Sequence, residues 1–132
     1  MTELPTLTIT KADLDERGVY IGAASVEDYD GNIEIAAKLG LVRFSGRLKA
    51  RGSIRAGLGT SIYAGGAIKA VGSIEAGVSI GAGGSICAGQ SIDAGGDIAA
   101  GGYIEACEYI KAGQSIKAGG SIKAGWDIDA GV

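Results

Sequence analysis

The sequence predicts an all-β fold made of short repeated strands, and three regularities carry this prediction. From residue 62 to residue 128, isoleucine occurs at every sixth position without a break. Alanine stands two residues after each of these isoleucines, and glycine usually follows the alanine, as at Gly65, Gly77 and Gly83. In an extended segment, residues two apart point the same way. Each Ser-Ile-x-Ala-Gly-Gly unit therefore predicts one short strand, with Ile and Ala inward, followed by a corner.

A helix is excluded, because a period of six does not fit 3.6 residues per turn and each interior glycine would cost about 1 kcal/mol relative to alanine. One such strand cannot bury its own isoleucine, but stacked coils can. The sequence thus predicts a β-solenoid, or β-helix, of hexapeptide repeats. With about three hexads per coil the period is 18 residues. The glycine pair is expected at the corners because glycine tolerates positive φ.

The hexads continue upstream in a less regular form. Val42-Arg43-Phe44, Leu48-Lys49-Ala50 and Ile54-Arg55-Ala56 follow one another at the same spacing of six. Leu58 and Gly59 then add two residues before the next unit, which predicts a bulge or a looser corner there. Residues 41–132 are therefore expected to form the solenoid.

Residues 1–40 lack the repeat and are predicted to be an N-terminal capping segment of mixed structure. Residues 10–18 predict a short helix, with Thr10 as N-cap, Asp13 three residues later and Gly18 as the C-terminal stop. Residues 19–24 and 32–37 predict strands, joined by a polar turn.

The composition argues against several functional classes. The net charge is −3, and the 12 basic and 15 acidic residues are interspersed, so no basic stripe is present for nucleic-acid binding. No histidine is present, and we predict neither a metal nor another cofactor. No catalytic constellation emerges, so we expect that the protein is not an enzyme. Cys87 and Cys107 are one coil plus two residues apart, which predicts free thiols. The chain has no stretch suited to a signal peptide or membrane span, so we expect a cytoplasmic protein without membrane contact.

The outward residues are expected to stack in columns about 4.8 Å apart. With 18 residues per coil, opposite charges become neighbours at Glu105–Lys123, Asp93–Lys111 and Lys111–Asp129, where exposed pairs are worth about 0–1 kcal/mol each. Larger side chains interrupt the small-residue background near the C-terminal end. We expect them around one corner of the solenoid, between the face that carries Glu105 and Lys123 and the face that carries Asp93, Lys111 and Asp129. These residues are Tyr103, Glu105, Glu108, Tyr109, Trp126 and Asp127.

Tyrosine and tryptophan are enriched at interface hot spots, so this corner is the candidate site for binding a partner protein. The alternative interpretation is that they are isolated surface aromatics, which are common. The last coil keeps Ile122 and Ile128 in register and reaches Val132 without a polar cap, which predicts self-association through this end, as a homodimer.

The repeats "SIKAGGSIKAGWDIDAG" and "EYIKAGQSIKAG" resemble those of small phage and prophage proteins that carry "IKAG" or "IEAG" hexads behind a short N-terminal segment. The resemblance implies a phage or bacterial origin and, by association, an inhibitor of host defence of the anti-CRISPR type. A three-hexad coil also resembles the left-handed hexapeptide β-helix of acyltransferases. That family places its small inward residue before the aliphatic one, so the handedness stays open, and the absence of histidine disfavours a transferase.

Three functions are compatible with these features. The first is a rigid, non-enzymatic binding protein, encoded by a phage, that inhibits a host protein such as a CRISPR-Cas component by direct binding. The second is a structural solenoid that assembles end to end, as bactofilin-type proteins do. The third, less favoured, is an ice-binding solenoid, whose flat threonine arrays have no counterpart among these mixed serine and charged columns.

Overall fold

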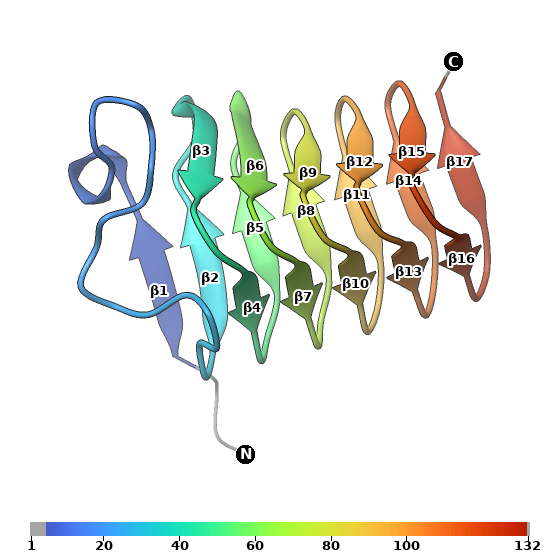
Figure 1. Ribbon diagram of the computed structural model, residues 1–132, viewed down its shortest axis with the longest axis horizontal. Coiled ribbons are helices and arrows are strands. Elements are labelled where there is room, and N and C mark those ends of the chain that lie inside the picture. The colour runs from blue at the N-terminus through green and yellow to red at the C-terminus, as the bar shows by residue number, and fades with distance from the viewer. Residues whose placement is uncertain (1–4, 132) are drawn as a thin grey trace.

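The computed structural model describes residues 5–131 and contains three parallel sheets of short strands wound around one axis (Figure 1). Face 1 consists of β4 (Leu48–Ala50), β7 (Ile68–Ala70), β10 (Ile86–Ala88), β13 (Ile104–Ala106) and β16 (Ile122–Ala124). Face 2 consists of β1 (Thr6–Ile9), β2 (Asn32–Ile35), β5 (Ile54–Ala56), β8 (Ile74–Ala76), β11 (Ile92–Ala94), β14 (Ile110–Ala112) and β17 (Ile128–Ala130). Face 3 consists of β3 (Gly40–Phe44), β6 (Thr60–Ala64), β9 (Ile80–Ala82), β12 (Ile98–Ala100) and β15 (Ile116–Ala118).

The strand pairing confirms the all-β solenoid with three hexads per coil. Each strand from β6 to β14 pairs with the strand three places later, so Ile62 lies beside Ile80 and Ile104 lies beside Ile122, a period of 18 residues. The strands β3–β17 make five such turns. The early turns are longer, because Val42 pairs with Ile62 after 20 residues.

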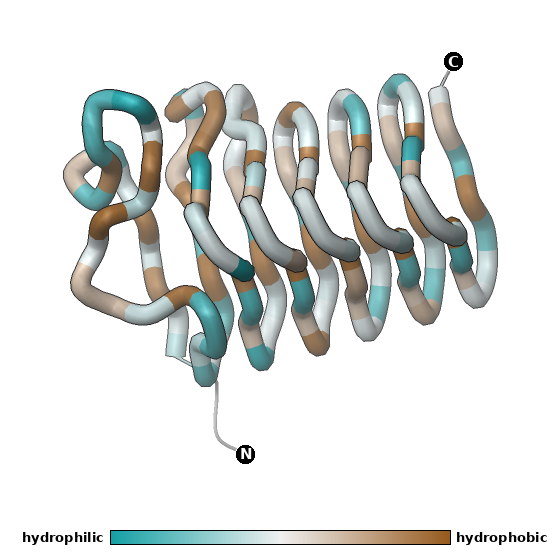
Figure 2. Tube along the Cα trace, viewed as in Figure 1, coloured by the Kyte–Doolittle hydropathy of each residue, from teal (hydrophilic) through white to brown (hydrophobic). Residues whose placement is uncertain are grey.

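The interior is a column of isoleucine and alanine, as the alternation predicts. The repeat isoleucines of the central turns, such as Ile86 and Ile104, are completely buried, and the alanines two residues later are also buried. Along each coil the apolar positions alternate with polar ones, which Figure 2 shows as short brown segments between paler and teal ones. Full burial of one isoleucine side chain contributes about 1.5–3 kcal/mol, so the repeat itself supplies most of the core.

The corners correct the expected role of glycine. Positive φ occurs at Gly18, Gly40 and Gly59, all outside the regular hexads, and at Lys38. The first residue of a regular corner is glycine except at Val71 and Cys107, and glycine is favoured there for a different reason. A Cβ on Gly113, for example, would overlap the carbonyl oxygen of Gly95 in the preceding turn. Close stacking of successive turns, rather than a left-handed backbone, therefore selects glycine.

The two extra residues at 58–59 form the looser corner that their insertion predicts. Gly59 adopts φ +78°, and Leu58 is 80% exposed. The corner is closed by Thr60, which is completely buried. Its Oγ1 donates to the carbonyl oxygen of Ala36 at 2.7 Å and accepts from the N–H of Leu39 at 3.1 Å.

The N-terminal segment differs from the prediction in its details. The expected helix at residues 10–18 is a single 3₁₀ turn, η1 (Lys11–Asp13). The predicted cap is present, since the Asp13 carboxylate accepts from the N–H of Thr10 at 2.9 Å. Gly18 has positive φ, but it lies five residues beyond the helix. Three residues cannot complete an α-helical turn of 3.6, and the capping contacts therefore close a turn rather than start a helix.

The two strands predicted in the segment have different outcomes. Asn32–Ile35 forms β2, which pairs with β1 on one side and with β5 on the other, so the sheet of face 2 continues into residues 1–40. Residues 19–24 make isolated bridges instead of a strand. One reason is packing: the phenol of Tyr20 donates to the carbonyl oxygen of Ala24 at 2.7 Å, which folds the segment back on itself.

The N-terminal segment lies over the first turn of the solenoid (Figure 1). Val19 bridges Arg43 of β3, and Tyr29 bridges Ala50 of β4. Val26 is buried in the core, and the Tyr20 ring lies 5.6 Å from that of Phe44 between centroids. The segment therefore covers the edges of β3 and β4 and part of the apolar interior at this end, while β1 is the edge strand of face 2.

Candidate binding surfaces

The corner between faces 1 and 2 stacks three large side chains in the column that the 18-residue period predicts. The N–H of Glu108 donates to the carbonyl oxygen of Gln90 at 3.0 Å, and the N–H of Trp126 donates to that of Glu108 at 2.8 Å. In the neighbouring column, the carbonyl oxygens of Tyr109 and Asp127 accept from the first strand residue of the turn below, at 3.0 Å and 2.9 Å. We call Glu108, Tyr109, Trp126 and Asp127 the C-terminal corner.

Side chains in these two columns form hydrogen bonds between residues that are 17 positions apart in the sequence. Ser73 Oγ donates to the Gln90 side-chain oxygen at 3.3 Å, and Ser91 Oγ donates to the Glu108 carboxylate at 3.1 Å. Each large corner residue thus leans toward the serine position of the turn below. Tyr109 and Trp126 occupy the next equivalent pair, where a phenol replaces serine and an indole replaces the carboxylate.

Trp126 is the most exposed aromatic side chain of this corner, at 69%, and Tyr109 and Glu108 beside it are half-buried. Asp127 is exposed. An exposed indole on a backbone held by parallel strands loses little conformational entropy when it is buried by a partner. The two flanking carboxylates favour a partner surface that is apolar at its centre and basic at its rim.

Tyr103 and Glu105, which the sequence also placed around this corner, lie elsewhere. Tyr103 precedes β13 at the corner between faces 3 and 1, where its N–H donates to Ser85 Oγ at 3.0 Å. Glu105 lies at the centre of β13, between Cys87 and Lys123. The grouping was wrong for Tyr103 because the whole of β13 separates it from Glu108, which is at the other end of the same strand.

Tyr103 instead forms the edge of a shallow hollow of about 380 Å³ over face 1, together with Glu105, Gly120 and Lys123. The pKa of Tyr103 is raised, first by a hydrogen bond to Cys87 and its charge, then by desolvation and by Glu105.

The charge columns are aligned as predicted, yet their members do not close into ion pairs. Glu105 is beside Lys123, and Lys111 is between Asp93 and Asp129. Within residues 5–131 the ion pairs within 4.0 Å are Lys49–Asp28, Arg51–Asp30 and Arg55–Glu75, all in the first turns. The outward strand centres of face 2 carry four carboxylates and two cations, so this face is acidic.

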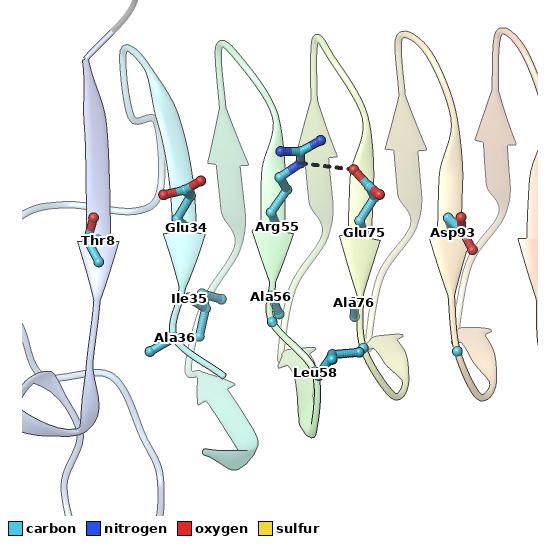
Figure 3. A pocket seen from close by; sticks show the side chains of 13 residues that line it. Thr8, Glu34, Ile35, Ala36, Arg55, Ala56, Leu58, Glu75, Ala76 and Asp93 are labelled. Carbon is cyan, nitrogen blue, oxygen red and sulfur yellow. Dashed lines mark hydrogen bonds and ion pairs between the residues drawn. The ribbon is translucent and has the colours of Figure 1, made fainter. Parts of the chain in front are cut away.

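A groove of about 580 Å³ on face 2 was not predicted from the sequence (Figure 3). Its floor carries Glu34, Arg55, Glu75 and Asp93 in a row, and the exposed Leu58 stands at one side. Arg55 Nε is 3.0 Å from Glu75 Oε2. The pKa of Asp93 is raised by partial burial and by the charge of Glu75, against the opposing effect of Lys111. The two-residue insertion at positions 58–59 is the sequence feature that could have indicated the groove, because Leu58 forms one side of it.

Cys87 and Cys107 are free thiols, as predicted. No group of three or more Cys, Asp or Glu residues in the described part of the chain is arranged to hold a metal ion. Among residues 5–131, no helix has the length and apolar character needed to cross a bilayer.

Searches against protein-family models, curated proteins and solved structures found no match for the chain.

Proposed function

We propose that this protein is a non-enzymatic, rigid β-solenoid that binds another protein through its C-terminal corner. The observation that carries the proposal is the position of Trp126, whose side chain is 69% exposed at a corner position that holds glycine in several other turns. The remaining regular corners hold valine, glutamine or glutamate there, so Trp126 is the aromatic residue of the series. Among residues 5–131 the indole has no hydrogen bond or ring-to-ring contact that would explain its size. Tryptophan is among the residues most enriched at interface hot spots.

The partner is a protein of the bacterial host, and binding inhibits it. The resemblance of the hexads to those of phage and prophage proteins supports a phage origin and a role against host defence, such as inhibition of a CRISPR-Cas component. Steric blocking fits a surface of this kind, because neither the corner nor the groove presents a nucleophile paired with a base. The site of action is the cytoplasm of the host cell, with no direct contact to nucleic acid or membrane.

A phage-plating assay tests this function. The chain is expressed in a bacterium whose CRISPR-Cas system restricts a phage, and the efficiency of plating is measured. The wild type is expected to restore plating, while Trp126→Ala combined with Tyr109→Ala loses the effect. Tyr63→Ala is the matched control, because Tyr63 is also an exposed aromatic but lies on face 3. Tyr103→Ala is a second control, now placed at a different corner.

The outcomes separate the function from the site. Restored plating by the wild type and by all variants would reject the C-terminal corner as the binding site. No restoration by the wild type against any tested defence system would reject the inhibitor function. A purified partner from the assay then gives the affinity loss of each variant directly, and thermal melts of the variants exclude unfolding as the cause.

Self-assembly into a structural solenoid, as in bactofilin-type proteins, is the second candidate. The exposure of Ile128 in the outermost turn favours it. A filament requires two complementary ends, however, and the N-terminal segment covers the strand edges of β3 and β4. Electron microscopy of the concentrated protein separates the cases, since filaments support this candidate and discrete particles reject it.

A further inference from the structure

The outermost described turn is formed by β15, β16 and β17, and within residues 5–131 each of them pairs with a strand on one side only. In this part of the chain the core of the turn is open to solvent. Ile116 and Ile122 are half-buried and Ile128 is 49% exposed, whereas the isoleucines one turn below are completely buried. Unpaired parallel strand edges above an apolar interior are a template for further strand pairing. Val132, which the sequence grouped with Ile122 and Ile128 for self-association, lies outside the described residues.

The helical rise of the chain determines which symmetric pairing is possible. Successive turns are about 4.8 Å apart, so each strand stands about 1.6 Å above the one before it. In the outermost turn β15 is therefore the lowest strand and β17 is the highest. Consider a two-fold axis that is perpendicular to the solenoid and passes through one face. The strand of that face then pairs with the same strand of a second copy, and each of the other two strands pairs with the other's counterpart in that copy. All three pairs are antiparallel.

Only one of the three axes gives equal gaps. With the axis through β16, the highest strand β17 meets the lowest strand β15 of a second copy, and all three gaps can be about 4.8 Å at once. With the axis through β15, a distance of about 4.8 Å between the two copies of β15 makes β16 of one copy overlap β17 of the other. With the axis through β17, the same distance between the two copies of β17 leaves β15 of one copy about 9.6 Å from β16 of the other, twice the distance for pairing.

The outward charges of the turn fit the same arrangement. The centres of β15, β16 and β17 carry Lys117, Lys123 and Asp129. Pairing β15 with β17 of a second copy places Lys117 opposite Asp129, and symmetry makes this contact twice. Directly opposed cross-strand pairs of opposite charge stabilise a sheet. Lys123 faces its own copy across the axis, and Glu105 on the adjacent strand partly offsets that repulsion.

We propose that a second copy of this chain binds the outermost turn, forming a closed homodimer with its two-fold axis through β16. The sheet of face 1 continues into face 1 of the second copy. The sheet of face 2 continues into face 3 of the second copy, and that of face 3 into its face 2. The arrangement stops at two copies because a two-fold interface uses the same surface on both copies and leaves none of it free. At the other end of each solenoid the N-terminal segment lies over β3 and β4. In this dimer the corner that holds Trp126 stands opposite the corner of Gly119 and Gly120 of the second copy.

Charge reversal tests the arrangement with the full chain. Sedimentation velocity is measured as a function of concentration for the wild type, Lys117→Asp, Asp129→Lys and the double variant. The wild type is expected to sediment as a dimer. Each single reversal sets like charges opposite each other twice and is expected to weaken dimerisation by roughly tenfold or more. The double variant restores the opposite pairing and is expected to restore most of the affinity.

The control is Lys69→Asp, which reverses a strand-centre charge on β7, three turns below the edge. It is expected to leave the dimer unchanged. A monomeric wild type at concentrations of tens of micromolar overturns the proposal, as does a dimer that is indifferent to both single reversals. Far-UV circular dichroism of each variant confirms folding. The plating assay above is independent of this result, because a monomer can still expose Trp126.

Discussion

The α-carbon of Gly119 lies so close to Gly101 of the preceding turn that a Cβ there would overlap the Gly101 carbonyl oxygen. A Cβ built on the next residue, Gly120, would have its nearest neighbour, the carbonyl oxygen of Gly102, at 3.4 Å. Both glycines are exposed and neither has positive φ. The two adjacent residues therefore differ in the space that separates them from the preceding turn.

Gly119→Ala is expected to lower stability, since the turns must separate to accommodate the methyl group. Overpacking of this kind costs about 1–3 kcal/mol. Gly120→Ala is the matched control, and it is expected to be neutral or to stabilise by about 0.4–1 kcal/mol through the loss of freedom in the unfolded chain. Thermal melts monitored by circular dichroism compare the two. Equal melting temperatures would show that turn stacking does not select glycine at this position.

The repeating part of the fold was predictable from the sequence because every hexad contains the same inward and outward positions. Ile and Ala two apart define the inward face, and the constant spacing aligns the columns that contain Glu108 and Trp126. The reason for glycine was not predictable in the same way, since the clash involves a carbonyl oxygen 18 residues away. The short helix failed because local capping signals at Thr10 and Asp13 also fit a single turn.

The candidate site was only partly predictable for a related reason. Column membership follows from arithmetic, and it placed Tyr109 and Asp127 correctly. Tyr103 lies outside this corner because it precedes β13, whereas Glu108 follows the same strand. The groove on face 2 depends on the height of the loop at Leu58, which no periodicity contains.

Burial along the solenoid predicts a gradient of sensitivity to truncation of isoleucine. Ile86→Ala removes a completely buried side chain between two turns and is expected to cost about 2–5 kcal/mol. Ile128→Ala is the comparison, and it is expected to cost clearly less in dilute monomeric protein because Ile128 is 49% exposed. Guanidinium denaturation at low protein concentration measures both. Equal costs would mean that the outermost turn is already covered under those conditions.

Two aspartates are expected to shift stability with pH in opposite directions. The pKa of Asp97 is lowered by hydrogen bonds from the Ser115 side chain and backbone N–H, at 2.7 Å and 3.0 Å. Asp97 therefore stabilises the fold at neutral pH, and this contribution is lost as the pH falls from about 4 through its folded pKa. The pKa of Asp93 is raised, mainly by desolvation and then by Glu75. Its charge is therefore unfavourable at neutral pH, and this penalty is relieved as the pH falls through its folded pKa.

The substitutions Asp97→Asn and Asp93→Asn test these signs against each other. At pH 7 the first is expected to lower the melting temperature and the second to raise it. At pH 3 both differences from the wild type are expected to shrink, since the carboxyls are largely protonated in the unfolded chain. The same sign for both variants at pH 7 would contradict the assigned causes of the two pKa shifts.

The buried hydroxyl of Thr60 joins the solenoid to its N-terminal segment, and its removal is expected to destabilise the protein. Thr60→Val keeps the volume but removes the bonds to the Ala36 carbonyl oxygen and the Leu39 N–H. A buried polar group left without a partner costs about 1–3 kcal/mol. Thr60→Ser retains the hydroxyl and is expected to recover most of that loss despite its missing methyl group. Amide hydrogen exchange gives a local readout, because the Leu39 N–H should lose protection in the valine variant and keep it in the serine variant. If valine proves as stable as threonine with Leu39 still protected, the corner at residues 57–60 is held by packing rather than by this hydroxyl.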